Sequence, residues 1–122
     1  MNIFVTDPDP VKCARVLPDK HIVKMPLETC QMLSIVCSLK WGHGFGTLPR
    51  ADGQPYKTTT GAFRNHPCTI WANSFVNNWR WLLAHGFAMC DEYALRYGKP
   101  HTCFNTLQAA NKILPCSDPQ GR

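Results

Sequence analysis

The sequence predicts an all-α fold, built as one compact domain of three to four helices. Two long stretches carry apolar residues at helical spacing, and only the first few residues are expected to be extended. Hydrophobic residues make up 44% of the 122 and charged residues 17%, which excludes a disordered or collagen-like chain. A chain of this length can bury one core. We therefore expect a single helical domain over residues 1–122.

The chain is expected to begin with an extended arm over residues 1–6, followed by a short helix. Asp9 before Pro10 is typical of an N-cap and the first helical position. The helix is predicted over residues 10–17, and it ends there because Pro18 disfavours helical backbone in the residue before it.

A long amphipathic helix is predicted over residues 20–40, with Asp19 as a candidate N-cap. At about 100° per residue, its apolar side carries Ile22, Val23, Leu27, Cys30, Leu33 and Cys37. The polar side carries His21, Lys24, Glu28 and Gln31. Pro26 is expected to kink this helix or to mark its true start.

Residues 41–64 are predicted to form a long loop, because they contain five glycines, two prolines and no helical period. Loops longer than about 12–15 residues are usually functional or mobile. A shorter helix is predicted over residues 102–113.

A second long helix is expected to begin at Pro67, with Asn65 or His66 as its cap, and to stop at Gly98. Gly86 within it favours close approach by another helix. The helical spacing of its aromatic residues favours core positions over base stacking, and this applies to Trp71, Phe75, Trp79 and Tyr93. Trp81 lies off this stripe and is expected to be the exposed one.

The seven cysteines are expected to be reduced and buried, as in a cytosolic protein. Their number is odd and no pair has C-x-x-C spacing, so a structural zinc site is disfavoured and no metal or cofactor is predicted. His66 with Cys68 and His101 with Cys103 are close, but not at a zinc-finger spacing. No apolar run approaches the roughly 18 residues of a membrane helix. The start of the chain lacks the features of a signal peptide, so we expect a cytoplasmic location, or the host cytoplasm for a viral protein.

The polar side of the first long helix is the strongest candidate for chemistry. His21, Lys24 and Glu28 bring an imidazole, an ammonium and a carboxylate to one face, where they can perform acid–base work. The alternative is a face that is simply solvated. The net charge of +5 permits a nucleic-acid partner without requiring one. A basic segment over residues 96–101 can contact phosphates, or can complement the dipole of a helix C-terminus.

Taken in order, several segments resemble the pyrimidine-dimer DNA glycosylase/AP-lyase family, over roughly residues 1–101. In the first third of the chain the matching pieces are the arm Met1-Asn2-Ile3-Phe4, the segment Leu17-Pro18-Asp19-Lys20-His21, and Glu28 seven residues after that His. The later pieces are Phe63-Arg64-Asn65-His66-Pro67 and Ala88-Met89-Cys90-Asp91-Glu92-Tyr93. The resemblance implies a small packing of three helices.

The resemblance also implies a chemistry in which the α-amine of the first residue is the nucleophile. That amine is assigned to Met1, because Asn2 is too large for efficient removal of the initiator. It attacks C1′ of a damaged or modified nucleotide, pyrimidine dimers by resemblance, and leaves an imine. The resemblance makes Glu28 the general acid/base and gives His21 an orienting role.

The partner implied is double-stranded DNA, bound by a monomer without a cofactor or a membrane. The residues expected to contact DNA are Lys20, Lys24, Arg64, Asn65, His66, Arg96 and Lys99. Two alternatives stay open. One is a non-catalytic, phage-type DNA- or protein-binding module on the same fold, and the other is a zinc-stabilised interaction module.

Overall fold

The computed structural model describes residues 7–36, 48 and 66–113, and within these residues it contains five helices and no strand. The helices are α1 (Pro10–Arg15), α2 (Asp19–Val36), α3 (Pro67–Ser74), α4 (Val76–Tyr97) and α5 (Phe104–Ile113). The predicted all-α fold is confirmed. The expected arm over 1–6 and, apart from Leu48, the expected loop over 41–64 lie outside the described residues. No helix in the described ranges is long and apolar enough to cross a membrane.

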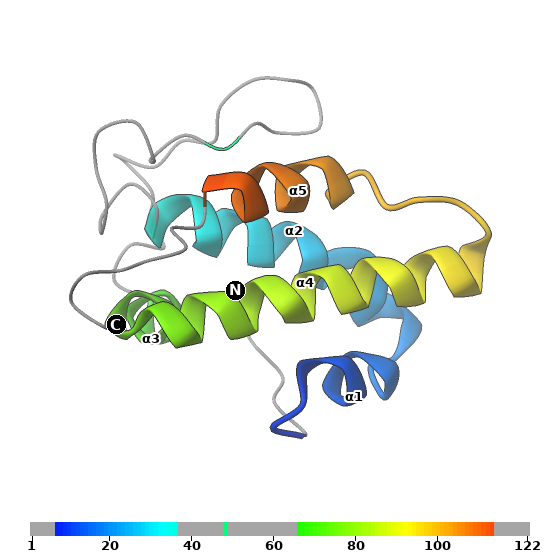
Figure 1. Cartoon of the computed structure of the whole chain (residues 1–122). Helices are drawn as coiled ribbons and strands as arrows, with labels where there is room; N and C mark the ends of the chain where they lie inside the picture. The colour runs from blue at the N-terminus through cyan, green and yellow to red at the C-terminus, as the bar shows by residue number, and fades with distance from the viewer. Residues whose placement is uncertain (1–6, 37–47, 49–65, 114–122) are drawn as a thin grey trace.

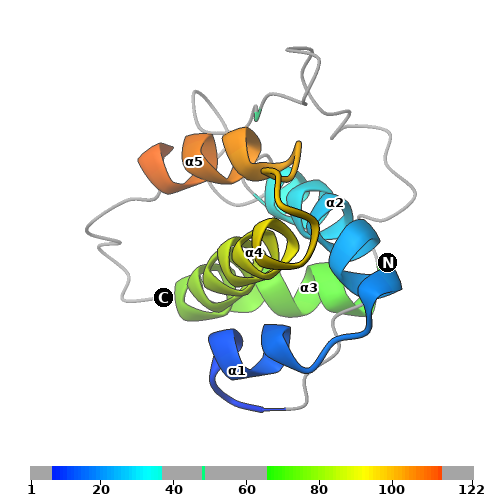
Figure 2. The same cartoon turned by 90° about the vertical axis from the view of Figure 1, so that its right-hand side faces the viewer.

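Helix α4 is the longest element, and the other helices are arranged around it (Figure 1). It contacts each of the other four. Figure 2 shows α1 on one side of α4 and both α2 and α5 on the opposite side. The α4 helix therefore connects the short N-terminal helix to the rest of the molecule.

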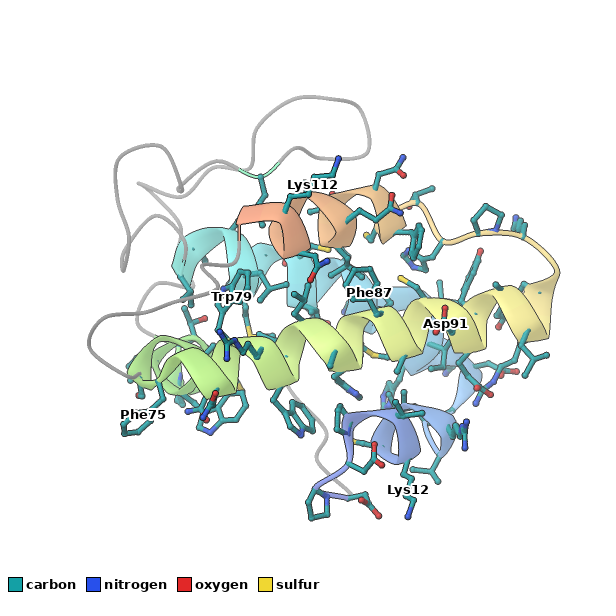
Figure 3. All side chains as sticks on the ribbon, viewed as in Figure 1. Lys12, Phe75, Trp79, Phe87, Asp91 and Lys112 are labelled. Atoms are coloured by element: carbon teal, nitrogen blue, oxygen red, sulfur yellow. The ribbon has the colours of Figure 1, made fainter. Side chains whose placement is uncertain are left out.

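Two clusters of buried side chains hold this arrangement together. The larger cluster joins α2, α3, α4 and α5, and Trp79 is its largest member. Figure 3 shows Trp79 directed from α4 toward α2 and α5, where its Nε1 donates to the Leu33 carbonyl at 3.5 Å. The smaller cluster joins α1 to α2 and α4, and its buried residues are Ala14, Leu17, Ile22, Met25, Ala88 and Met89.

Several helix ends lie where the sequence predicts them. Asp9 caps α1, with its side chain accepting from the amides of Val11 and Lys12. His66 is the cap of α3, and Pro67 occupies the first turn. Gly98 ends α4 in the left-handed region, at φ 72°, and its amide donates to the Ala94 carbonyl.

The second long helix is interrupted, so the prediction of one continuous helix is wrong. Phe75 is extended, with φ −143° and ψ 147°, and separates α3 from α4. Polar side chains take carbonyls that a continuous helix would use: Ser74 Oγ donates to the Ile70 carbonyl, and Asn78 Nδ2 donates to the Trp71 carbonyl, both at 2.8 Å. Side chains of this type compete with backbone hydrogen bonding, which favours the break.

The break also changes the position of two aromatic residues. Trp71 and Phe75 are exposed, the latter by 57%, so their expected core positions are wrong, whereas Trp79 is buried as predicted. Figure 3 shows Phe75 at the outer end of α4. Trp81 is half-buried and not the exposed member of the set, because its Nε1 donates to the Pro8 carbonyl at 2.7 Å.

Helix α2 continues through Pro26, which therefore does not mark its start. Val23 and Leu27 are exposed, although they were expected on the apolar side. The buried side is centred instead on Ile22, Met25 and Thr29. In the second half of α2 the burial extends around most of the helix, because α3, α4 and α5 all contact α2.

Gly86 confirms the predicted close approach to α4. A Cβ atom placed there would lie 3.0 Å from Thr29 Cγ2 on α2 and 3.0 Å from Leu107 Cδ2 on α5. The absent side chain allows three helices to meet at this level.

Candidate catalytic site

The candidate catalytic side chains follow one side of α2 over its first three turns. His21, Lys24 and Glu28 are spaced by three and four residues, which places them on one face of a helix. Their exposure differs along this face. Lys24 is exposed, His21 is half-buried, and Glu28 is only 7% exposed. A simply solvated face therefore does not describe this part of α2.

Glu28 is one of the buried residues of α2, whereas His21 is only partly buried. The Oε2 atom of Glu28 and the Nδ1 atom of His21 are both shielded from solvent. A carboxylate loses hydration energy on burial, so such a group needs partners inside the protein or on its substrate. In the same low-dielectric surroundings it interacts more strongly with a positive charge than it would in water. Glu28 is thus suited to stabilise a cation brought against it.

Three exposed lysines lie at the end of the molecule where α2 begins and α4 stops. Lys20 and Lys24 are on the first turns of α2, and Lys99 follows α4. The two chain segments are joined by His101, whose Nε2 lies 2.8 Å from the Val23 carbonyl. Exposed ammonium groups in this arrangement can contact phosphates, which position a protein on DNA.

The two basic residues of α1, Lys12 and Arg15, lie on a different surface from the three lysines, beside the Asp7–Pro10 turn. Lys12 and Arg15 line an open hollow of about 390 Å³ together with Asp7 and Val16. Figure 3 shows Lys12 directed from α1 away from α4. These two cations add positive charge outside the α2 stripe, the face of α2 that carries His21, Lys24 and Glu28.

Arg96 has a structural position, which argues against its expected contact with DNA. Its NH1 group donates to the Leu17 carbonyl at 2.8 Å and to Asp19 Oδ1 at 3.0 Å. NH2 donates to the Arg15 carbonyl at 3.1 Å, and Nε donates to Glu92 Oε1 at 3.0 Å. The guanidinium therefore ties the connection between α1 and α2 to α4, and we exclude Arg96 from the DNA-contacting set.

His66, also expected near DNA, serves as a helix cap. Its Nδ1 accepts from the Cys68 amide at 3.1 Å. His101 does the same at the start of α5, where its Nδ1 accepts from the Cys103 amide at 3.0 Å. The sequence signal for the second cap was the repeated His-x-Cys spacing before a helix. Within the described residues, no group of three or more His, Cys, Asp or Glu could hold a metal ion.

Three buried thiols lie between α2, α4 and α5. A hydrogen bond from Cys30 is the main cause that lowers the pKa of Cys103 to about 5, and His101 adds to the effect. Burial raises the pKa of Cys90 to about 12, and charge on Cys103 contributes. All three are buried members of the larger cluster, so a DNA backbone cannot reach them and they are not part of the candidate site.

The structure brings together only part of the predicted site. His21, Lys24 and Glu28 share a face of α2, and Lys20 adjoins it. Met1, Arg64 and Asn65 lie outside the described residues, so their predicted roles stay predictions.

Comparison with known proteins now places the chain in a family. The family model described as pyrimidine dimer DNA glycosylase matches residues 1–105, which include the α2 stripe and every helix through α4. The comparisons with curated proteins and with solved structures found no match. Because the matched stretch covers most of the 122 residues, the chain belongs to the pyrimidine dimer DNA glycosylase family.

Proposed function

We propose that this protein is a DNA glycosylase with AP-lyase activity, in which the α-amine of Met1 is the nucleophile and Glu28 is the general acid/base. Family membership supports the glycosylase reaction. The observation that carries the residue assignment is the burial of Glu28, which is 7% exposed on the same face of α2 as the exposed Lys24. A buried carboxylate beside an exposed cation suits a site that receives a phosphodiester backbone and a developing positive charge.

The reaction would start with attack of the unprotonated α-amine on C1′ of the target nucleotide. The bond between C1′ and the base breaks, and the base leaves with a proton. Opening of the sugar ring then gives a protonated imine between C1′ and the amine. Loss of a proton from C2′ expels the 3′ phosphate and nicks the strand. An α-amine has an ordinary pKa near 8, so a useful fraction is unprotonated at neutral pH.

Each residue of the α2 stripe has a task in this scheme. The Glu28 carboxylate would stabilise the cationic sugar and move protons during ring opening and elimination. His21, one of whose ring nitrogens is shielded from solvent, would orient the sugar or the carboxylate. Lys20 and Lys24 would hold flanking phosphates, with Lys99 at the same end of the molecule.

The substrate in this proposal is double-stranded DNA with a damaged or modified base. C1′ is accessible only when the nucleotide leaves the stack, which costs a few kcal/mol and costs less for a damaged pair. A small number of lysine–phosphate contacts also predicts a shallow salt dependence of binding.

Borohydride trapping on DNA with a single abasic site tests the proposal. Wild-type protein is expected to form a covalent adduct, because borohydride reduces the imine. Glu28→Gln is expected to lower the trapping rate by about a hundredfold or more, as typical for loss of a general acid/base. Asp91→Asn is the matched control, because Asp91 is an exposed carboxylate on α4 and its substitution should change nothing.

Blocking the amine separates the parts of the proposal. Protein with an acetylated or extended N-terminus should form no adduct, and an adduct with such protein would reject the amine as nucleophile. If wild-type protein forms no adduct with abasic DNA or with dimer-containing DNA but still binds DNA, the non-catalytic alternative is correct.

A further inference from the structure

The turn that precedes α1 has most of its backbone polar groups bonded within the protein. The Asp9 amide donates to Asp7 Oδ1 at 2.8 Å, and the prolines at 8 and 10 have no amide hydrogen. The Asp9 carbonyl accepts from the Cys13 amide at 3.0 Å. The carbonyls of Pro8 and Pro10 also accept from side chains outside the turn.

Two side chains of α4 supply those donors. Trp81 Nε1 donates to the Pro8 carbonyl at 2.7 Å, and His85 Nδ1 lies 3.1 Å from the Pro10 carbonyl. Because a carbonyl only accepts, His85 must carry its proton on Nδ1. The two residues are one helical turn apart, and their rings lie against each other with centroids at 5.0 Å and planes inclined by 30°. Each ring therefore fixes the orientation of the other.

These bonds act at one end of α1 only. The other end is already held by Arg96, whose guanidinium bonds the carbonyls of Arg15 and Leu17. The smaller apolar cluster holds α1 through Ala14, and it holds the segment that follows α1 through Leu17. Trp81 and His85 are consequently not the main attachment of α1, but they fix the point at which residues 1–6 join the folded helices.

We infer that Trp81 and His85 are positioning residues for the N-terminal amine: by clamping the Asp7–Pro10 turn to α4 they fix the point at which the arm begins, and so restrict the region that the nucleophile can reach relative to Glu28. The inference rests on the function proposed above. Six residues span at most about 20 Å when fully extended, so the position of the turn limits where the amine can lie. Reaction rates fall steeply when reacting groups are misplaced by even about 1 Å.

The first test measures the pKa of the α-amine without any DNA, from the pH dependence of its selective acylation. If the amine lies beside Glu28, Glu28→Gln should lower this pKa by about 1 unit, because loss of a nearby negative charge disfavours the ammonium form. In a Trp81→Phe background, which removes the Nε1 donor and keeps an aromatic ring, the same substitution should shift the pKa by less than half as much.

The second test measures single-turnover trapping on abasic DNA. Trp81→Phe and His85→Leu should each slow trapping about tenfold, while the dissociation constant for DNA and the melting temperature stay close to the wild-type values. His85→Asn should restore the wild-type rate, because the asparagine amide can donate from the position of Nδ1. Trp71→Phe is the matched control. The Trp71 ring packs edge-on against Trp81, with ring centroids 6.0 Å apart, but Trp71 makes no hydrogen bond to the Asp7–Pro10 turn.

The outcomes separate the inference from the proposed function. If Glu28→Gln shifts the amine pKa equally in the wild-type and Trp81→Phe backgrounds, or if trapping is as fast in both clamp variants as in wild type, the inference is wrong and the proposed function stands. If Glu28→Gln leaves the amine pKa unchanged in the wild-type background, both the site assignment and the inference are wrong.

Discussion

Glu28 and Lys24 are four residues apart on the same side of α2, yet the carboxylate is buried and the ammonium is exposed. Their shared face could be predicted from spacing alone, because helical geometry is local. The burial of Glu28 could not, because it depends on how the second half of α2 is enclosed by helices that lie 30 or more residues away.

Arg96 offers a test of the distinction between structural and DNA-contacting cations. Arg96→Lys should lower the free energy of unfolding by about 1–2 kcal/mol, because a lysine cannot reproduce the fork that bonds Asp19, Glu92 and two carbonyls. Urea denaturation measures this change. The expected loss of stability is moderate because the Arg96 side chain is 22% exposed, so solvent weakens its ion pairs.

Lys99→Gln is the contrasting variant, because Lys99 is exposed beyond the end of α4. It should leave the free energy of unfolding unchanged and weaken DNA binding, with a smaller salt dependence. If Arg96→Lys weakens DNA binding at unchanged stability, the structural assignment of Arg96 is incorrect.

His85 predicts a pH dependence of stability. Burial lowers its pKa in the folded protein, and the hydrogen bond to the Pro10 carbonyl opposes this only in part. Above pH 6.5 the imidazole is neutral in both states, so it contributes no pH dependence. As the pH falls below 6.5 the unfolded chain binds the proton first, and the free energy of unfolding decreases until the pH reaches the folded-state pKa.

Urea denaturation at pH 7.5 and pH 5.5 measures this effect in wild type and in His85→Asn. Wild type should lose more unfolding free energy between these pH values, by up to about 1 kcal/mol. The carboxylates contribute equally to both proteins and cancel in the difference. Equal losses in the two proteins would show that folding does not lower the pKa of His85.

At the scale of elements, local signals predicted most helix ends, and side-chain hydrogen bonds produced the exception. The caps at Asp9 and His66 and the stop at Gly98 could be predicted because each depends on a few neighbouring residues. The break at Phe75 could not be predicted from periodicity, because apolar spacing continues across it. Ser74 carried a signal that hydropathy ignores, since its hydroxyl competes for a helix carbonyl.

Gly98 ends α4, and its substitution should measure how much a left-handed residue at this position contributes to the free energy of unfolding. Gly98→Ala should lower the free energy of unfolding by about 1 kcal/mol, because φ is 72° and a Cβ is strained there. No atom lies within 4 Å of the added carbon, so backbone strain is the only source of the effect. Gly98→Asn should cost less, because Asn tolerates this region better than Ala. Equal stability of all three proteins in urea would contradict the assignment.

At the scale of the whole molecule, α4 connects two apolar clusters with different tasks. The larger cluster contains buried apolar residues from the second half of α2, the helix that also carries the buried Glu28. The smaller cluster holds α1, from whose N-terminal turn the proposed nucleophilic arm departs. In the proposed mechanism, the packing along α4 therefore sets the distance between Glu28 and the turn at which the arm begins. Composition and periodicity could predict that a core exists, but not that it divides into two clusters along α4.

This division predicts two levels of stability that native-state thiol labelling can measure. Cys13 lies in α1, whereas Cys30 and Cys103 lie in the larger cluster, and all three are buried. Each therefore reacts with a thiol reagent only when its surroundings open. We expect Cys13 to react through opening of α1 alone, at a lower free energy than global unfolding, and Cys30 and Cys103 to react only through global unfolding. Mass spectrometry of labelled peptides across a urea series reads each site separately.

The same labelling experiment on Trp81→Phe measures how much the hydrogen bond of Trp81 contributes to holding α1 in place. Trp81→Phe should lower the opening free energy at Cys13 and leave the values at Cys30 and Cys103 unchanged, because the lost hydrogen bond joins only the turn before α1 to α4. Labelling of all three sites at one common free energy would show that the molecule opens as a single unit. In that case α1 cannot shift without global unfolding, and the hydrogen bonds of Trp81 and His85 would not be needed to keep the arm in place.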